Sequence, residues 1–239
     1  MNPRRPEASF RRRNHAARGW TLARISGSFR TMRRWLPILI CLLLASPRAG
    51  ATPPKWATFT VATANLSDNV TQAYGAPGIR IVQALQPDVL AIQEYNYKLG
   101  TSQDLAQRLF GPDCHFAREN GGARLPNGVM SRYPIVAFGQ WEDPYVGNRS
   151  FFWATVQIPG PKPLHVVSVH LVQNHAERRL PEARHLLELI RKQFPEGDYV
   201  ALCGDFNVAS RDSTALAALT NWFDDSAQPV DQAGNKNTN

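Results

Sequence analysis

The sequence predicts an α/β sandwich, in which mixed β-sheets are covered by helices. Apolar segments of strand length alternate with segments of helical character, and two of the strands flank a Pro-Gly-Pro turn as a hairpin. Hairpins combined with helical crossovers are typical of sheets that carry helices on their faces. Residues 52–239 are long enough to form one domain with a substantial core.

The first predicted strands are apolar runs that finish in polar residues. Residues 58–64 end at Asn65, and residues 89–92 end at Gln93-Glu94. A short helix at 79–86 is predicted between them, and Pro87 stops it because proline has no amide hydrogen to donate.

A second helix is predicted at 102–110, followed by a weak strand at 127–132 that ends at the turn of Tyr133-Pro134. The strands at 151–158 and 164–171 flank Pro159-Gly160-Pro161, so they read as a hairpin.

The carboxyl-terminal part reads as helix, strand and helix. Asn174 with Glu177 three residues later predicts a capping-box start for a helix that runs to about Phe194. A buried strand follows at 199–202, and a helix at about 213–219.

The amino terminus predicts export. Met32-Arg33-Arg34 precedes an apolar stretch at 35–45, and Ala49-Gly50-Ala51 forms a small-residue cleavage site before Thr52. This is the order of a secretory signal peptide, and its apolar part is too short to span a bilayer stably. We expect residues 1–31 to come from a mis-called upstream start, 32–51 to be the signal peptide and 52–239 to be the domain. The mature chain would be periplasmic or secreted, with no stable membrane span.

The net positive charge of the chain comes from residues 1–51, which cleavage of the predicted signal peptide would remove. The whole chain carries a formal charge of +8, but residues 1–51 hold 11 arginines and a single acid, Glu7. The remainder has 16 basic against 18 acidic residues, a net charge of −2. A basic surface that would favour nucleic acid is therefore not predicted for the mature domain.

Four predicted strands end in polar side chains, and these form the candidate site. They are Asn65, Glu94, His170, and Asp205 with Asn207. The alternation of side chains along a strand places Asp205 and Asn207 on the same side of the chain. Functional groups of layered α/β folds gather outside strand ends, so we expect these five to lie together.

The chemistry of this set favours a hard cation. It comprises two carboxylates, two carboxamides and one imidazole, whereas a zinc site would call for clustered histidines or cysteines. Oxygen ligands of this kind suit Mg²⁺ or Mn²⁺. Such an ion can neutralise a phosphodiester and stabilise its leaving oxygen while a side chain activates water.

On these residues the chain resembles the endonuclease/exonuclease/phosphatase superfamily, which has a deoxyribonuclease-I-like fold. The matching pieces occur in the order of that superfamily and are Thr63-Ala64-Asn65-Leu66, Ile92-Gln93-Glu94, Met130-Ser131-Arg132-Tyr133-Pro134, Ser168-Val169-His170-Leu171 and Gly204-Asp205-Phe206-Asn207. The resemblance implies a four-layered α/β sandwich of mixed sheets flanked by helices, and a metal-dependent phosphoesterase.

The resemblance also implies roles for the strand-end residues. Glu94 would be the principal metal carboxylate, with Asn65 beside it as a metal and substrate ligand. His170 would bind and polarise the scissile phosphate, Asp205 would orient or activate the attacking water, and Asn207 would hold a phosphate oxygen.

Two further residues, Arg149 and Asn127, match as substrate phosphate contacts. The implied partner is a phosphoester substrate, either nucleic acid or a small phosphodiester or phosphomonoester, and the protein is expected to be a monomer.

One part of the superfamily pattern has no counterpart. Its final strand carries Ser-Asp-His, and all histidines of this chain precede Asp205. We therefore expect the carboxyl-terminal strand or strands to be missing, and the loss of that histidine to lower activity about 10²–10⁴-fold.

Three functions stay open at this point. The first is a secreted metal-dependent phosphodiesterase or nuclease. The second is an exported phosphatase of small phosphoesters or lipid head groups, and the third is an inactive fragment or metal-binding pseudoenzyme.

Overall fold

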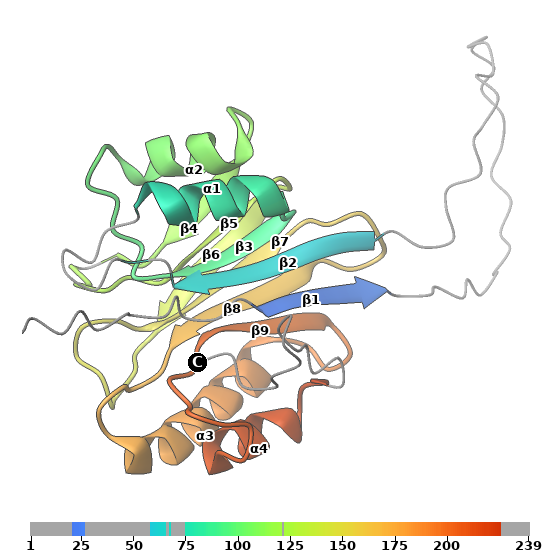
Figure 1. Cartoon of the computed structure of the whole chain (residues 1–239). Coiled ribbons are helices and arrows are strands. Elements are labelled where there is room, and N and C mark those ends of the chain that lie inside the picture. The colour runs from blue at the N-terminus through green and yellow to red at the C-terminus, as the bar shows by residue number, and fades with distance from the viewer. Residues whose placement is uncertain (1–20, 27–57, 66, 68–74, 121, 226–239) are drawn as a thin grey trace, which may run out of the picture.

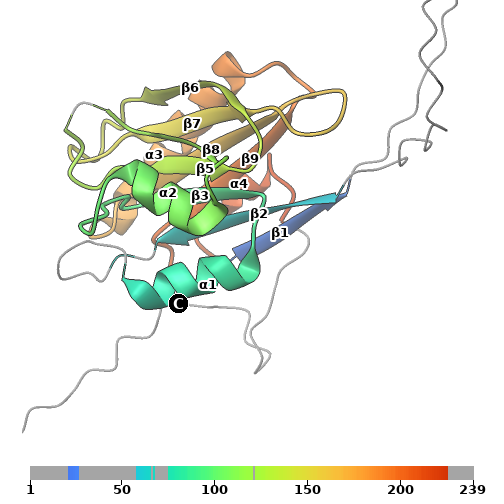
Figure 2. The ribbon, with the colours of Figure 1, turned by 90° about the horizontal axis from the view of Figure 1, so that it is seen from above.

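Two mixed β-sheets pack face to face, and each carries two helices on its outer surface (Figures 1 and 2). The computed structural model describes residues 21–26, 58–65, 67, 75–120 and 122–225. The layers run from α1 and α2 through the first sheet and the second sheet to α3 and α4. The four-layered sandwich expected from the sequence is thereby confirmed.

The first sheet has five strands in the order β1-β2-β3-β5-β4. Their bounds are Thr21–Ser26 for β1, Thr58–Asn65 for β2, Val89–Gln93 for β3, His115–Arg118 for β4 and Gly128–Ser131 for β5. Strands β2 and β3 are parallel, and their carboxyl ends therefore lie at the same edge of the sheet.

The second sheet has four strands in the order β6-β7-β8-β9. Their bounds are Ile135–Trp141 for β6, Phe151–Val156 for β7, Leu164–His170 for β8 and Tyr199–Asp205 for β9. Strands β7 and β8 form the predicted antiparallel hairpin. Strands β8 and β9 are parallel, which repeats in this sheet the arrangement of β2 and β3.

The core lies in three layers. Valine, alanine and phenylalanine side chains such as Val89, Val129 and Phe152 fill the space between the sheets. Helices α1 (Ala76–Leu85) and α2 (Ser102–Phe110) cover the outer face of the first sheet. Helices α3 (Ala176–Gln193) and α4 (Thr214–Thr220) cover the second sheet. Burial on both faces explains why β3 and β8 are apolar along most of their length.

Two helix starts differ from the prediction. Helix α1 begins three residues earlier than expected because Pro77 occupies its first turn, where the missing amide hydrogen costs nothing. Helix α3 has His175 as its N-cap, so the predicted Asn174–Glu177 capping box is wrong. The Glu177 carboxylate instead pairs with the His175 ring at 3.3 Å.

Strand β1 was not expected from the sequence, which placed residues 1–31 outside the folded domain. Thr21–Ser26 pairs antiparallel with β2, with Thr21 opposite Thr63 and Ser26 opposite Thr58. The pairing satisfies backbone groups along the edge of β2 that faces away from β3. It does not bear on where translation starts, so the boundaries at residues 31 and 51 stay predictions.

The signal peptide predicted at 32–51 and the polar tail from Gln228 to Asn239 lie outside the described residues. Within the described part of the chain, no helix combines the length and the apolar character needed to cross a membrane.

Candidate active site

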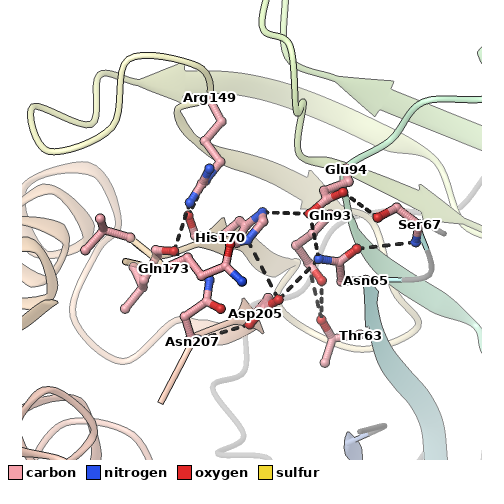
Figure 3. A network of polar contacts seen from close by, with 12 residues as sticks. Thr63, Asn65, Ser67, Gln93, Glu94, Arg149, His170, Gln173, Asp205 and Asn207 are labelled. Carbon is pink, nitrogen blue, oxygen red and sulfur yellow. Dashed lines mark hydrogen bonds and ion pairs between the residues drawn. The ribbon is translucent and has the colours of Figure 1, made fainter. Parts of the chain in front are cut away.

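The carboxyl ends of the two parallel strand pairs meet between the sheets. In the first sheet Asn65 and Gln93 are register partners, and Glu94 follows directly. In the second sheet His170 and Asp205 are register partners. Backbone ladders therefore fix the positions from which the predicted side chains project, and Figure 3 shows these side chains pointing toward one another.

Asn65 joins the two carboxylates of the site. Its amide Nδ2 donates to Glu94 Oε1 at 3.1 Å and to Asp205 Oδ2 at 3.2 Å. Glu94 comes from the first sheet and Asp205 from the second, so one carboxamide links the sheets at this point (Figure 3). The amide oxygen of Asn65 accepts the backbone N–H of Ser67 at 3.4 Å.

The imidazole of His170 lies between the same two carboxylates. Its Nδ1 is 3.8 Å from Glu94 Oε1 and its Nε2 is 3.7 Å from Asp205 Oδ2. The side chain is only 3% exposed. The ring is thus enclosed by two carboxyl groups from different sheets, and its nitrogens are groups of the site that can donate hydrogen bonds to an anionic substrate.

Two of the site residues have left-handed backbone conformations. Glu94 has φ 52° and Asn207 has φ 50°, values that residues other than glycine adopt at a cost. Each residue follows the end of a strand. Because its φ is positive, its side chain does not continue the alternation of side chains along that strand. Within the described residues, Gln86 alone among other non-glycine residues has positive φ.

Asn207 reaches the site for a different reason than the one predicted. Strand β9 ends at Asp205, so strand alternation does not govern Asn207. The carboxylate of Asp205 accepts the backbone N–H of Asn207 at 3.0 Å, which closes a turn. Asn207 Nδ2 then donates to the carbonyl oxygen of Leu171 at 2.8 Å.

Arg149 and Asn127 support backbone near the site. Arg149 donates from Nε to His170 O and from Nη2 to Leu171 O. Asn127 is fully buried, and its Nδ2 donates to Ser150 O at 2.7 Å. A contact between either residue and substrate stays a prediction.

A second polar network, which the sequence reading did not include, lies beneath the site. Gln93 Nε2 donates to Ser168 Oγ at 3.0 Å, and Ser168 Oγ donates to the carbonyl oxygen of Ile92 at 3.1 Å. Thr63 Oγ1 meets the Gln93 carboxamide at 3.3–3.4 Å. The sequence feature that could have indicated this network is a polar residue within an apolar strand, such as Ser168 in β8. A buried polar group of this kind needs a hydrogen-bond partner.

Ser67 is another neighbour that strand ends alone did not reveal. Its hydroxyl donates to Glu94 Oε2, on the side of the carboxylate opposite to Asn65. His165, by contrast, lies away from the site. It bonds to Thr155 Oγ1 at 3.0 Å and to Asp198 at 3.2 Å, and it lies five residues before His170, on the opposite face of β8.

The donor set fits a hard divalent cation that also uses water and substrate oxygens. Among the described residues no group of three or more histidine, cysteine, aspartate or glutamate side chains is spaced to enclose a metal ion. Mg²⁺ is commonly held by one or two carboxylates together with waters and phosphate oxygens. Glu94, with the carboxamide of Asn65 at 3.1 Å from its Oε1, offers such a partial set.

The sequence profile of the endonuclease/exonuclease/phosphatase family matches residues 78–238. The chain belongs to this family. Its class of reaction is phosphoester hydrolysis, and the matched region contains Glu94, His170, Asp205 and Asn207. No curated protein sequence matches the chain.

Solved structures share the fold at low sequence identity. A mannosyl-6-phosphatase of Bacteroides thetaiotaomicron VPI-5482 is 16% identical with a TM-score of 0.53, covering 68% of this chain and 70% of that one. A functionally unknown protein of Enterococcus faecalis V583 is 18% identical with a TM-score of 0.54, covering 70% and 73%.

D. rerio TDP2 complexed with a single-strand DNA product is 21% identical, with a TM-score of 0.52. The match covers 66% of this chain and 64% of that one, slightly less than two thirds of the TDP2 chain. At these identities the likeness shows the fold alone.

Proposed function

We propose that this chain is a divalent-metal-dependent phosphodiesterase, with nuclease-like chemistry at the ends of β2, β3, β8 and β9. The observation that carries the proposal is the position of His170, whose two ring nitrogens lie 3.8 and 3.7 Å from the Glu94 and Asp205 carboxylates. An imidazole held between two carboxylates beside a carboxamide is suited to binding an anionic phosphate and moving protons.

Glu94 and Asn65 are the residues that would hold Mg²⁺ or Mn²⁺. When bound, the ion would neutralise charge on the phosphate and on the leaving oxygen. For the Asn65 oxygen to serve as a ligand, its carboxamide has to turn, because its nitrogen faces both carboxylates here.

The remaining steps fall to this chain's own side chains. His170 can donate a ring N–H to an oxygen of the scissile phosphate. Asp205 orients the attacking water and accepts its proton. Asn207 Nδ2 has one hydrogen on Leu171 O and a second that can hold a phosphate oxygen.

A phosphatase of small phosphoesters is the second candidate, supported by the shared fold of the mannosyl-6-phosphatase. The net charge of −2 over residues 52–239 favours a small substrate over a long duplex, whose binding relies on many basic contacts.

The experiment compares hydrolysis of bis-p-nitrophenyl phosphate, a diester, with that of p-nitrophenyl phosphate, a monoester. Both are measured with Mg²⁺, with Mn²⁺ and with a chelator. His170→Ala is the active-site variant, and His115→Ala, which changes an exposed histidine on β4, is its control. We expect chelator-sensitive hydrolysis that His170→Ala lowers by at least about 10²-fold and His115→Ala leaves unchanged.

The outcomes separate the three functions. Faster hydrolysis of the diester supports the phosphodiesterase, and faster hydrolysis of the monoester supports the phosphatase. Bound metal with no hydrolysis of either ester would favour a metal-binding pseudoenzyme. Hydrolysis that persists in the chelator and in His170→Ala would contradict the proposed site.

We also propose a monomer that is exported to the periplasm or medium. The support is the signal-like order of residues 32–51. The mass of the native protein recovered from those fractions should correspond to a start at Thr52, so that the exported chain would have the first sheet without β1. A native chain that retains residues 1–51 would contradict export by cleavage.

A further inference from the structure

The segment 170–173, where the chain leaves β8, is held by arginine and glutamate side chains from other parts of the chain. Arg149, just before β7, donates from Nε to the carbonyl oxygen of His170 at 2.5 Å. Its Nη2 donates to the carbonyl oxygen of Leu171 at 2.9 Å. The planar guanidinium therefore bridges two successive carbonyl groups, which a lysine ammonium cannot reproduce.

Helix α3 holds the next two residues of the segment. Both carboxylate oxygens of Glu182 accept the backbone N–H of Val172, each at 3.0 Å. Arg179 donates from Nε to Val172 O at 2.8 Å and from Nη2 to Gln173 O. Basic and acidic groups thus satisfy the carbonyl and amide groups that the strand ladder no longer reaches.

The contacts of Arg149 and Glu182 are buried, whereas those of Arg179 are partly exposed. Arg149 is 8% exposed and Glu182 is 0% exposed. Burial lowers the pKa of Arg149, while the carboxyl groups of Glu182 and Asp143, followed by those of Glu94 and Asp205, favour its charged form. Ionisable side chains are seldom buried without partners, and here the backbone of residues 170–172 provides those partners.

The held segment contains His170 and is hydrogen-bonded to Asn207. His170 is its first residue, and Asn207 Nδ2 shares the Leu171 carbonyl oxygen with Arg149. The backbone N–H of Leu171 donates to Asp205 O at 2.9 Å. A shift of the segment would therefore displace His170 and Asn207 together; Figure 3 shows both side chains close to Arg149 and Asp205.

We propose that Arg149 and Glu182 are positioning residues, which set the direction of His170 and Asn207 by clamping the backbone of the segment 170–173. In this assignment Arg149 acts through backbone carbonyl groups and does not contact the substrate. The inference rests on the proposed phosphoesterase function for its kinetic test, but its structural part can be tested without turnover.

The kinetic test compares Arg149→Lys with Arg184→Lys, which changes an exposed arginine on α3. A positioning role predicts that Arg149→Lys lowers kcat roughly 10- to 100-fold with little change in KM, because small misplacements of reacting groups are costly. A phosphate contact predicts mainly a higher KM, and that result would overturn the proposal. Arg184→Lys should match the wild type.

The structural test follows the imidazole signals of His170 by nuclear magnetic resonance, with His165 as the internal reference. We expect the His170 signals to shift or broaden in Arg149→Lys and in Glu182→Ala, and those of His165 to stay. Glu182→Gln retains an oxygen for the Val172 N–H, so it should restore the wild-type His170 signals.

The kinetic test and the nuclear magnetic resonance test can fail independently of each other. Unchanged His170 signals in Arg149→Lys overturn the clamp, whatever the activity. A wild type without hydrolytic activity overturns the proposed function, and the His170 signals still decide the clamp. If Arg149→Lys does not fold, the comparison of Glu182→Ala with Glu182→Gln decides it, and equal His170 signals in those two variants overturn it.

Discussion

His170 and Asp205 are register partners in the parallel pair of β8 and β9, and their side chains meet with 3.7 Å between Nε2 and Oδ2. The backbone ladder therefore fixes the spacing of an imidazole and a carboxylate that come from positions 35 residues apart in the sequence. Glu94 and Asn65 reach the same point from the other sheet. The site therefore forms only when the two sheets pack against each other.

Asp205→Asn should lower hydrolysis strongly while the fold is kept. The substitution preserves shape but removes the negative charge beside His170 and the proton acceptor for water. We expect kcat to fall about 10²–10⁴-fold. Asp212→Asn, an exposed aspartate after β9, is the matched control and should retain full activity. Equal rates for the two variants would show that Asp205 has no part in the reaction.

Asn65→Asp should destabilise the metal-free protein. The wild-type amide donates to both Glu94 and Asp205, so an aspartate places a third carboxylate where a donor stood. We expect a loss of about 1–3 kcal/mol in the free energy of unfolding, measured by urea denaturation in a chelator. Mn²⁺ should restore part of it, because the cation replaces the lost donor. An equal loss with and without metal would argue against a cation at this position.

Gly204→Ala should disrupt the site through the backbone. A Cβ at Gly204 would lie 2.1 Å from the carbonyl oxygen of Val169 on the neighbouring strand, so the two strands have to separate. We expect a loss of about 3 kcal/mol or more in the free energy of unfolding. Gly147→Ala, where a Cβ meets nothing within 4 Å, is the control and should change stability little. A stable Gly204→Ala protein would mean that β8 and β9 can separate at low cost.

The sequence predicted those helices and strands whose local pattern of apolar and polar residues is clear. Strands β2, β3, β7 and β8 were apolar runs with clear ends, and helix α2 was predicted with its observed bounds. Strand β6 was missed because it lies at a sheet edge, where the exposed Val136 and Phe138 give no alternation of buried and polar residues. Strand β4 was missed because its sequence, His-Phe-Ala-Arg, has polar residues at both ends and contains no apolar run.

The sequence predicted those residues of the candidate site that directly follow an apolar strand, and it missed the residues that support them. Asn65, Glu94, His170 and Asp205 follow apolar runs, and the structure brings them into contact. The positive φ of Asn207 could not be foreseen from strand alternation. The supporting contacts of Arg149 link distant segments, and only the tertiary structure determines such pairs.

Metal binding should stabilise the fold through Glu94. Any ion that binds the folded state alone raises stability, by about 2.7 kcal/mol at a concentration of 100 times Kd. We expect thermal unfolding to shift upward with Mn²⁺ or Mg²⁺ and to return on addition of a chelator. Glu94→Gln should abolish the shift, whereas Glu188→Gln, an exposed glutamate on α3, should keep it. A shift that persists in Glu94→Gln would place the ion elsewhere.

The contribution of Glu182 to the free energy of unfolding should fall as the pH rises from about 4.5 to about 8. Burial, and after it the neighbouring Asp143 carboxyl group, raises the pKa of Glu182 from 4.5 to about 8. The folded state therefore keeps a proton that the unfolded state loses across this range, and this contribution to stability is lost as the pH increases.

Glu182→Gln removes that titration while it keeps an oxygen for Val172 N–H, so its free energy of unfolding should vary less with pH than that of the wild type. Glu119→Gln is the comparison. Burial raises the pKa of Glu119 to about 7, so this variant should flatten the profile only up to about that pH. Urea denaturation at a series of pH values measures both. A wild-type stability that rises between pH 4.5 and 8 relative to Glu182→Gln would show that Glu182 is already ionised in the folded protein.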